Sequence, residues 1–270
     1  MEKIALPQKI EFVKGSNANN KQITIEPCYP GYGATIGNAL RRVLLSSLPG
    51  AAVVGVKIKG ADHEFMTLPH VKEDVLELIL NLKKLRLKVF SDETVKIELD
   101  ARGEKEVKAS DIKKNSLVEI ANPDLILGHV TDMAGSLSME IFVAQGAGYI
   151  TVESRESAKN EIGYIEMDSI FSPVMSVGVN IEYVRIGKMT NWDKLVLDLT
   201  TDGTITPEDA FHKSVDILIN QFNALVEKTG EEEVKEKKET KEEIKEEIAE
   251  KEAETDEDKK SKKRGRPKKS

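Results

Sequence analysis

A cluster of glycines stands directly before a predicted helix, where backbone N–H groups could hold an anion. The run Gly31-Tyr32-Gly33-Ala34-Thr35-Ile36-Gly37 has this placement, and helix N-termini attract phosphate. A dinucleotide-binding loop would need glycine in place of Ile36, and a phosphate loop would end in Gly-Lys-Ser or Gly-Lys-Thr. Neither pattern is present. The sequence therefore favours a tight turn into a helix, with Gly37 allowing close packing.

The remaining residues that could do chemistry form no catalytic or metal-binding pattern. None of the four histidines belongs to a usual metal-ligand spacing such as HExxH. They are His63, His70, His129 and His212. Asp62-His63-Glu64 places ligand types side by side, but neighbours on a strand point to opposite faces. No nucleophile signature surrounds a serine or Cys28, the lone cysteine. We expect no catalytic residue, metal or cofactor in this chain.

The end of the sequence has a different chemistry, suited to DNA. The run Lys262-Lys263-Arg264-Gly265-Arg266-Pro267-Lys268-Lys269 resembles an AT-hook, an Arg-Gly-Arg-Pro peptide flanked by lysines. Two arginines on an extended backbone can lie in a narrow A·T minor groove, where the negative potential is strongest. The alternative is a basic tail that adds only nonspecific nucleic-acid affinity or has no measurable effect.

Charge is distributed unevenly around this basic segment. The chain has 270 residues, 32% of them charged, and a net charge of −7. Residues 231–258 carry −9 and residues 259–270 carry +8, so the preceding 230 residues sum to −6. This arrangement is typical of a folded body followed by a disordered charged tail. The lone cysteine, the missing signal peptide and the short apolar runs indicate a cytosolic protein that does not enter membranes.

The body alternates between strand and helix patterns. Apolar residues at helical spacing predict helices over Thr35–Leu48, with Thr35 as the cap, and over Val71–Leu82. Period-two or clustered apolar residues predict strands, the first two joined as a hairpin. The expected strands are Ile10–Val13, Ile23–Ile25, Ala51–Lys59, Leu85–Phe90, Val95–Leu99, Leu125–His129, Ser136–Val143, Val174–Val184 and Lys194–Leu199.

A third helix is predicted near the end of the body. Thr206-Pro207-Glu208-Asp209 combines a cap, a first-turn proline and acids where the helix dipole favours them. From Phe211 a wide apolar stripe continues to Val226. Such a stripe must be covered, either by the chain's own sheet or by a helix of another chain. The pattern alone leaves both possibilities open.

A longer similarity points to a family. Residues 33–50, Gly33-Ala34-Thr35-Ile36-Gly37-Asn38-Ala39-Leu40-Arg41-Arg42-Val43-Leu44-Leu45-Ser46-Ser47-Leu48-Pro49-Gly50, closely resemble the signature of the bacterial RNA polymerase alpha subunit. Further similarity covers His63-Glu64-Phe65 and the segments 71–83, 172–174, 193–196 and 202–210. The resemblance spans most of residues 5–228.

The resemblance implies an α+β architecture with two domains, one inserted in the other. An α/β dimerisation domain would comprise residues 1–50 and 172–230, and a mainly β inserted domain residues 51–171. An acidic disordered linker, 231–258, and the basic AT-hook-like tail, 259–270, would follow. The sequence after residue 230 does not resemble the small helical DNA-binding domain that typical family members carry.

The resemblance also implies partners. The family forms a homodimer that docks the beta and beta-prime subunits of a nucleotide-polymerising complex, whose activity would not reside in this chain. The implied beta contacts are Arg42 first, then Asn38, Arg41, Glu64 and Phe65; beta-prime contacts would lie on the inserted domain and Ser172–Val174. The implied dimer contacts are Leu40, Leu44, Leu48, Val215, Leu218, Phe222 and Leu225.

A different reading of the same features is an independent dimeric DNA-architectural protein whose AT-hook is its main activity. Co-purification distinguishes the two, because only the first would bring very large polymerase subunits with it. The expected location is the bacterial cytoplasm, in association with the nucleoid, or the plastid stroma. For Arg42 the sequence also allows a solvated charge or an ion pair within the chain.

Overall fold

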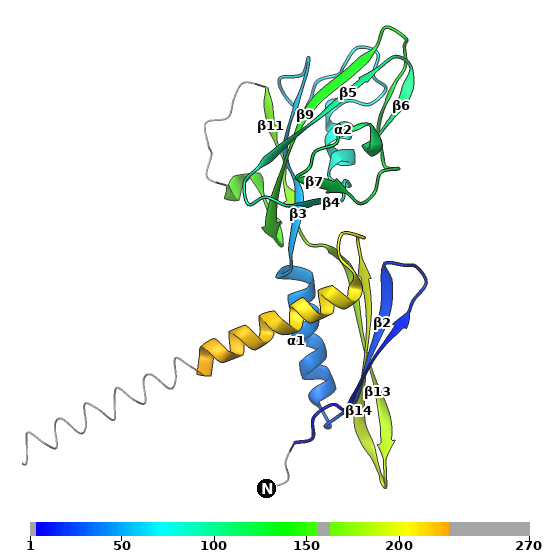
Figure 1. Cartoon of the computed structure of the whole chain (residues 1–270), viewed down its shortest axis with the longest axis vertical. Coiled ribbons are helices and arrows are strands. Elements are labelled where there is room, and N and C mark those ends of the chain that lie inside the picture. Colours follow the sequence, from blue (N-terminus) through cyan, green and yellow to red (C-terminus); the bar gives the residue numbers. More distant parts are fainter. Residues whose placement is uncertain (1–3, 156–162, 227–270) are drawn as a thin grey trace, which may run out of the picture. The chain divides into compact units, whose positions relative to one another are not determined.

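The computed structural model describes residues 4–155 and 163–226. They form an α+β fold, as predicted, in which most elements are strands (Figure 1). The chain divides into two units between Leu218 and Ile219. This division falls within a helix whose described residues are 207–226. The other helices are α1 (Tyr32–Ser46) and α2 (Val75–Leu82), with 3-10 turns at Ala109–Asp111 and Val152–Ser154.

One antiparallel sheet joins the two ends of the body. Its strand order is β1-β2-β14-β13, and the predicted N-terminal hairpin is confirmed as β1 paired with β2. Strands far apart in the sequence therefore lie side by side at the β2–β14 pair. The strand bounds are β1 (Lys9–Lys14), β2 (Asn20–Cys28), β13 (Val174–Ile186) and β14 (Met189–Thr201).

Helix α1 covers this sheet through its small and apolar residues. A Cβ atom added at Gly37 would lie 2.8 Å from Leu195 Cδ1 and 2.9 Å from Val179 Cγ1. The predicted close packing at Gly37 is therefore confirmed. Further along the helix, Leu40 and Leu44 are buried in the core between helix and sheet. Burying such side chains contributes about 1.5–3 kcal/mol each.

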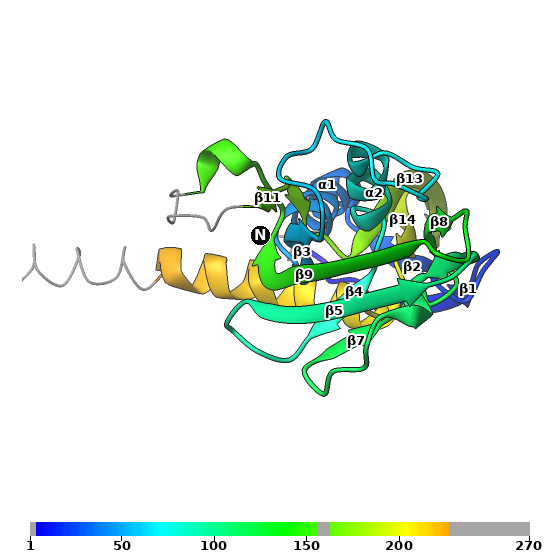
Figure 2. The ribbon, with the colours of Figure 1, turned by 90° about the horizontal axis from the view of Figure 1, so that it is seen from above.

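A second core forms around the sheet of order β11-β3-β9-β5 and helix α2. Figure 2 shows β9 and β5 running side by side, and their residues pair in antiparallel register. Strand β5 alternates buried Val95, Ile97, Leu99 and Ala101 with outward charged residues, as its period-two pattern predicts. The sheet strands are β3 (Pro49–Ile58), β5 (Val95–Arg102), β9 (Ser136–Ala147) and β11 (Tyr164–Glu166).

Three short strand pairs complete this part of the chain. They are β4 (Leu87–Val89) with β7 (Val118–Ile120), β6 (Lys105–Lys108) with β8 (Ile126–Val130), and β10 (Tyr149–Ile150) with β12 (Ser169–Ile170). The second core draws on residues 53–167, and the core between α1 and the first sheet draws on residues before and after that range. The domain boundaries implied by the resemblance, 50/51 and 171/172, stay a prediction.

The beginning of α2 differs from the prediction. The helix begins at Val75 rather than Val71, because the Asp74 carboxylate accepts a hydrogen bond from the Glu77 N–H at 2.7 Å and caps the helix. By contrast, the predicted cap of the helix at residues 207–226 is confirmed. Thr206 Oγ1 accepts from the Asp209 N–H at 3.1 Å, and its hydroxyl donates to Asp209 Oδ2 at 2.7 Å.

A carboxylate next to α2 ties its N-terminal segment to β8. Glu73 Oε2 accepts from the His129 N–H at 2.7 Å, and Glu73 Oε1 lies 2.5 Å from His129 Nδ1. Burial opposes the ionisation of Glu73, but the hydrogen bonds from the His129 ring and backbone outweigh it. They hold the pKa of Glu73 below its ordinary value.

The Glu73–His129 contact predicts a pH-dependent stability. We expect Glu73→Gln to lower the free energy of unfolding by about 1–3 kcal/mol at neutral pH, because the partly buried charged acceptor of the His129 hydrogen bonds is lost. A carboxylate with a depressed pKa stabilises the fold fully above the ordinary glutamate value of about 4.3, and this contribution disappears as pH falls through the lowered pKa. Urea unfolding from neutral pH down to about pH 3 measures it.

The exposed Glu93 supplies the control. Glu93→Gln should change the unfolding free energy by less than about 0.5 kcal/mol across the same pH range. A Glu73→Gln deficit that stays constant down to the lowest pH would contradict the assigned cause.

Candidate subunit interface

The outward face of α1 presents three polar residues that were implied as contacts. Asn38, Arg41 and Arg42 are exposed, and spacings of three and four place them on one side of the helix. Leu45, one turn further, is 37% exposed and adds an apolar surface to the same face. The inner face is committed to the core, so this outer face is what α1 can offer to another molecule.

The two arginines have no ion pair with the chain's described residues. No salt bridge within residues 4–155 and 163–226 involves Arg41 or Arg42. The sequence allowed Arg42 to be a solvated charge or part of an ion pair within the chain. The ion pair is absent among these residues. A guanidinium presents five donors in a rigid fork, which suits carbonyl and carboxylate groups of a protein partner.

The orientation of α1 depends on a residue that the sequence analysis did not identify as a cap. Asp193, only 4% exposed, accepts hydrogen bonds at Oδ2 from the Gly31 N–H at 2.9 Å and the Gly33 N–H at 3.1 Å. Its charge lies where the helix dipole is positive. The predicted cap at Thr35 is wrong, because α1 already begins at Tyr32 after Gly31, whose φ of 85° suits glycine.

Glu64 and Phe65 lie elsewhere, in the loop between β3 and α2. Phe65 is 77% exposed, whereas Glu64 is half-buried. The Phe65 N–H donates to His63 Nδ1 at 3.2 Å, which turns the backbone back on itself. The loop therefore holds an aromatic side chain in solvent. Sequence reasoning placed these residues in the same set as Arg42, but they belong to a separate surface segment.

The residues implied as dimer contacts fall into three groups. Leu40, Leu44 and Leu48 are 3%, 0% and 1% exposed, so they are already covered by the chain's own core. Val215 and Leu218 are partly buried against that core. Phe222 and Leu225 are each 61% exposed. The exposed members are the ones that a second chain could cover, together with Ile219, which is 49% exposed and was not in the implied set.

The described residues provide no evidence of a chemical centre. No group of three or more His, Cys, Asp or Glu side chains in residues 4–155 and 163–226 is placed to hold a metal ion. In the same described ranges, every helix is too short or too polar to cross a lipid bilayer. The DNA-contact residues predicted at Lys262, Lys263, Arg264, Gly265, Arg266, Pro267, Lys268 and Lys269 lie outside the described part.

Comparison with known proteins identifies the architecture. Residues 56–172 match the family model described as the RNA polymerase Rpb3/RpoA insert domain. This match covers the strand-rich core around β5 and β9, and it indicates that this part of the chain is an insert domain of the Rpb3/RpoA class.

Curated relatives make the assignment narrower. DNA-directed RNA polymerase subunit alpha of Carboxydothermus hydrogenoformans is 46% identical over 205 residues, covering 76% of this chain and 65% of the relative. The subunits of Oceanobacillus iheyensis and Symbiobacterium thermophilum are 46% and 47% identical and are covered over 71% and 74% of their length. The chain belongs to the family of DNA-directed RNA polymerase alpha subunits, which confirms the resemblance.

Proposed function

We propose that this protein is the noncatalytic assembly subunit of its polymerase, pairing with a second copy and docking the beta and beta-prime subunits. The observation that carries the proposal is the outer face of α1. There, Arg41 and Arg42 project from a helix that Gly37, Leu40 and Leu44 hold rigidly against the sheet. The packed helix fixes the backbone from which the arginines project, and a planar guanidinium loses relatively little side-chain entropy for each hydrogen bond it forms, which favours a stable subunit contact.

Pairing with a second copy would use the exposed end of the apolar stripe. Ile219 and Phe222 are three residues apart on the helix of residues 207–226 and are 49% and 61% exposed. Buried leucines of α1 are poor reporters of this interface, because Leu→Ala in a core costs about 2–5 kcal/mol of folding free energy whether or not a dimer forms. Substituting an exposed aromatic residue instead tests association, because it changes the folding free energy of the single chain little.

Phe222→Ser in the full-length chain should weaken the homodimer about 10- to 100-fold, because central aromatic residues dominate interface energies. Light scattering over a dilution series measures the dissociation constant. Asn223→Ser, at the neighbouring exposed position, is the matched control and should dimerise like the unsubstituted chain. An unsubstituted chain that stays monomeric at high concentration, or a Phe222→Ser chain that dimerises equally tightly, would reject the pairing.

Docking of beta would use Arg42, with Asn38, Arg41, Glu64 and Phe65 as further contacts, and beta-prime would meet the inserted domain and Ser172–Val174. We expect Arg42→Ala to reduce co-purification of beta about tenfold or more, because arginines are enriched among interface hot spots. The variant should keep its fold and its homodimer, since Arg42 is exposed. Arg185→Ala removes another exposed arginine, on β13 and outside the inserted domain, and serves as the control.

The same pull-down tests the alternative of an independent DNA-architectural protein. Purification of the full-length chain from its cells should bring both large polymerase subunits with it. A chain recovered alone and as a dimer would favour the architectural function instead.

We also propose that the basic tail gives the polymerase a tethered contact with A·T-rich minor grooves. Support comes from the Arg264-Gly265-Arg266-Pro267 run and its flanking lysines. As a flexible coil, the 28-residue acidic segment 231–258 would span roughly 30 Å and so act as the tether of the tail.

Deleting residues 262–269 should remove footprint protection of A·T-rich DNA upstream of promoters. Arg264→Lys/Arg266→Lys is the sharper variant, because it keeps the charge but loses the flat guanidinium groups that fit the minor groove. We expect this variant to lose the preference for A·T sequence while keeping most of its salt-dependent nonspecific affinity. Protection and promoter output that are unchanged in both variants would reject a role for the tail.

A further inference from the structure

Helix α1 receives its N-terminal cap from another element of the chain. Its N-cap residue is Gly31, which has no side chain to accept a hydrogen bond, and its first turn contains no acid. Asp193 of β14 supplies both the acceptor and the charge, since its Oδ2 accepts from the Gly31 and Gly33 N–H groups. α2 and the helix of residues 207–226 have local caps. Among these three described helices, only α1 is capped from a distant strand.

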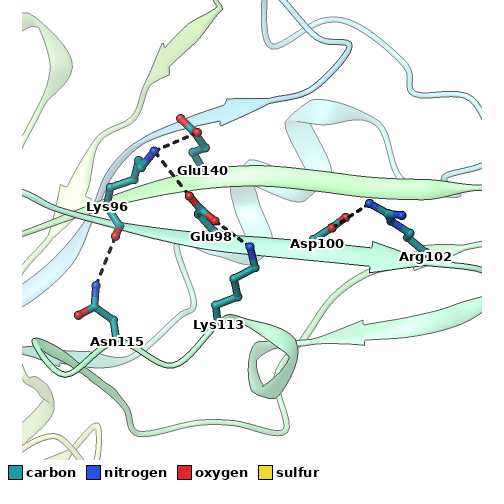
Figure 3. A network of polar contacts seen from close by, with 7 residues as sticks. All are labelled: Lys96, Glu98, Asp100, Arg102, Lys113, Asn115 and Glu140. Atoms are coloured by element: carbon teal, nitrogen blue, oxygen red, sulfur yellow. Dashed lines mark hydrogen bonds and ion pairs between the residues drawn. The ribbon is translucent and has the colours of Figure 1, made fainter.

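Asp193 differs from the surface carboxylates of the chain in what offsets its charge. On β5, Glu98 pairs with Lys113 and Asp100 pairs with Arg102 in an exposed network (Figure 3). Asp193 is only 4% exposed, and it forms no salt bridge with any residue that the structure describes. Burying a carboxylate without a cation is costly. Here the backbone N–H groups and the positive end of the α1 dipole offset this cost, so the charge is committed to the helix end.

Both neighbours of the Asp193 carboxylate, the sheet and the helix, restrict its position. Asp193 pairs with Cys28 of β2, and the register of this ladder shifts between Asp193 and Leu195. Irregularities of this kind re-aim a side chain. Cys28 and Leu195 are both 0% exposed, so the backbone around Asp193 is enclosed in the core. On the helix side, a Cβ atom at Gly33 would lie 2.9 Å from Asp193 Cβ, and a larger residue there would displace the carboxylate.

Arg42 projects from the side of α1 opposite to this contact. It follows Gly33 by nine residues, and at about 100° per residue the two positions differ by about half a turn. A rotation or tilt of the first turn therefore changes the direction of the guanidinium, although Asp193 lies on the other side of the helix. We propose that Asp193 is a positioning residue for docking of beta, because it fixes the rotation of α1 at which Arg42 meets that subunit. This inference rests on the proposed docking function.

Binding of beta to the full-length chain tests the proposal. We expect Asp193→Ala to weaken binding about fivefold or more, because Arg42 then projects from a less fixed helix. Asp193→Asn keeps an oxygen that can accept from the same N–H groups, and should bind within about twofold of the unsubstituted chain. Asp198→Ala removes an exposed aspartate of the same strand and is the matched control. An Asp193→Asn chain that binds as weakly as Asp193→Ala would overturn positioning through these hydrogen bonds.

A double-substitution cycle separates positioning from a general loss of stability. If Asp193 acts through Arg42, the Arg42→Ala/Asp193→Ala chain should bind beta within about twofold of Arg42→Ala alone. Losses that add in full would overturn the proposal, because they would show that Asp193 acts on something else. An Arg42→Ala chain that binds beta normally would reject the docking function and this inference with it. A loss in Arg42→Ala that Asp193→Ala does not share would overturn this inference alone.

Gly33→Ala keeps the proposal testable if Asp193→Ala does not fold, because it displaces the carboxylate without removing it. It should weaken beta binding to a similar extent. Hydrogen exchange of the free chain measures the cap directly, and amides of residues 32–38 should exchange about fivefold or more faster in either variant. The homodimer, whose proposed exposed contacts begin at Ile219, should keep its affinity. Unchanged exchange of these amides would overturn the proposal.

Discussion

The close packing of α1 on β13 and β14 is the interaction on which the rest of the structure depends. Glycine at positions 33 and 37 lets the helix backbone approach the sheet, and the Asp193 carboxylate holds the helix end in place. Together they fix the rotation of α1 about its axis. Rotation by one residue, about 100°, would expose Leu40 and turn a guanidinium toward the core, which costs several kcal/mol. The outward direction of Arg42 is thus a consequence of how the inner face packs.

Much of this arrangement could be predicted from residue patterns, because it depends on local periodicity. The helical spacing from Thr35 to Leu48 located α1, and the strand alternation at Val95–Leu99 located β5. The start of α1 was predicted wrongly, because the residue that caps it is distant in sequence. Asp193 caps a helix 160 residues away, and no local pattern relates the two. The strands of two or three residues, such as β10 and β12, are too short to show a period at all.

The apolar stripe that begins at Phe211 shows a different limit of sequence reasoning. Phe211 is 4% exposed and Phe222 is 61% exposed, although both occupy the same periodic pattern. Periodicity reports that a face is apolar, but not what covers it, because solvent exposure depends on the neighbouring strands. The family resemblance supplied the candidate interface residues, and the structure then separated those already buried from those a partner could reach. Likewise, only the three-dimensional structure could show that Arg42 forms no salt bridge within residues 4–155 and 163–226.

One contact explains how the chain leaves the first sheet, forms the region from β3 to β12 and then re-enters the sheet. Gly50 opens this region and Phe171 follows it, and a Cβ atom at Gly50 would collide with the Phe171 carbonyl oxygen. Phe171 itself is buried with Ala52 and Val54 in a small separate core. The segments that leave and re-enter the first sheet are therefore held side by side. For the first sheet, the residues between Gly50 and Phe171 are equivalent to a loop whose two ends are already joined. Because loop-closure entropy rises only with the logarithm of length, a long intervening region adds little to the cost of forming the β2–β14 pair.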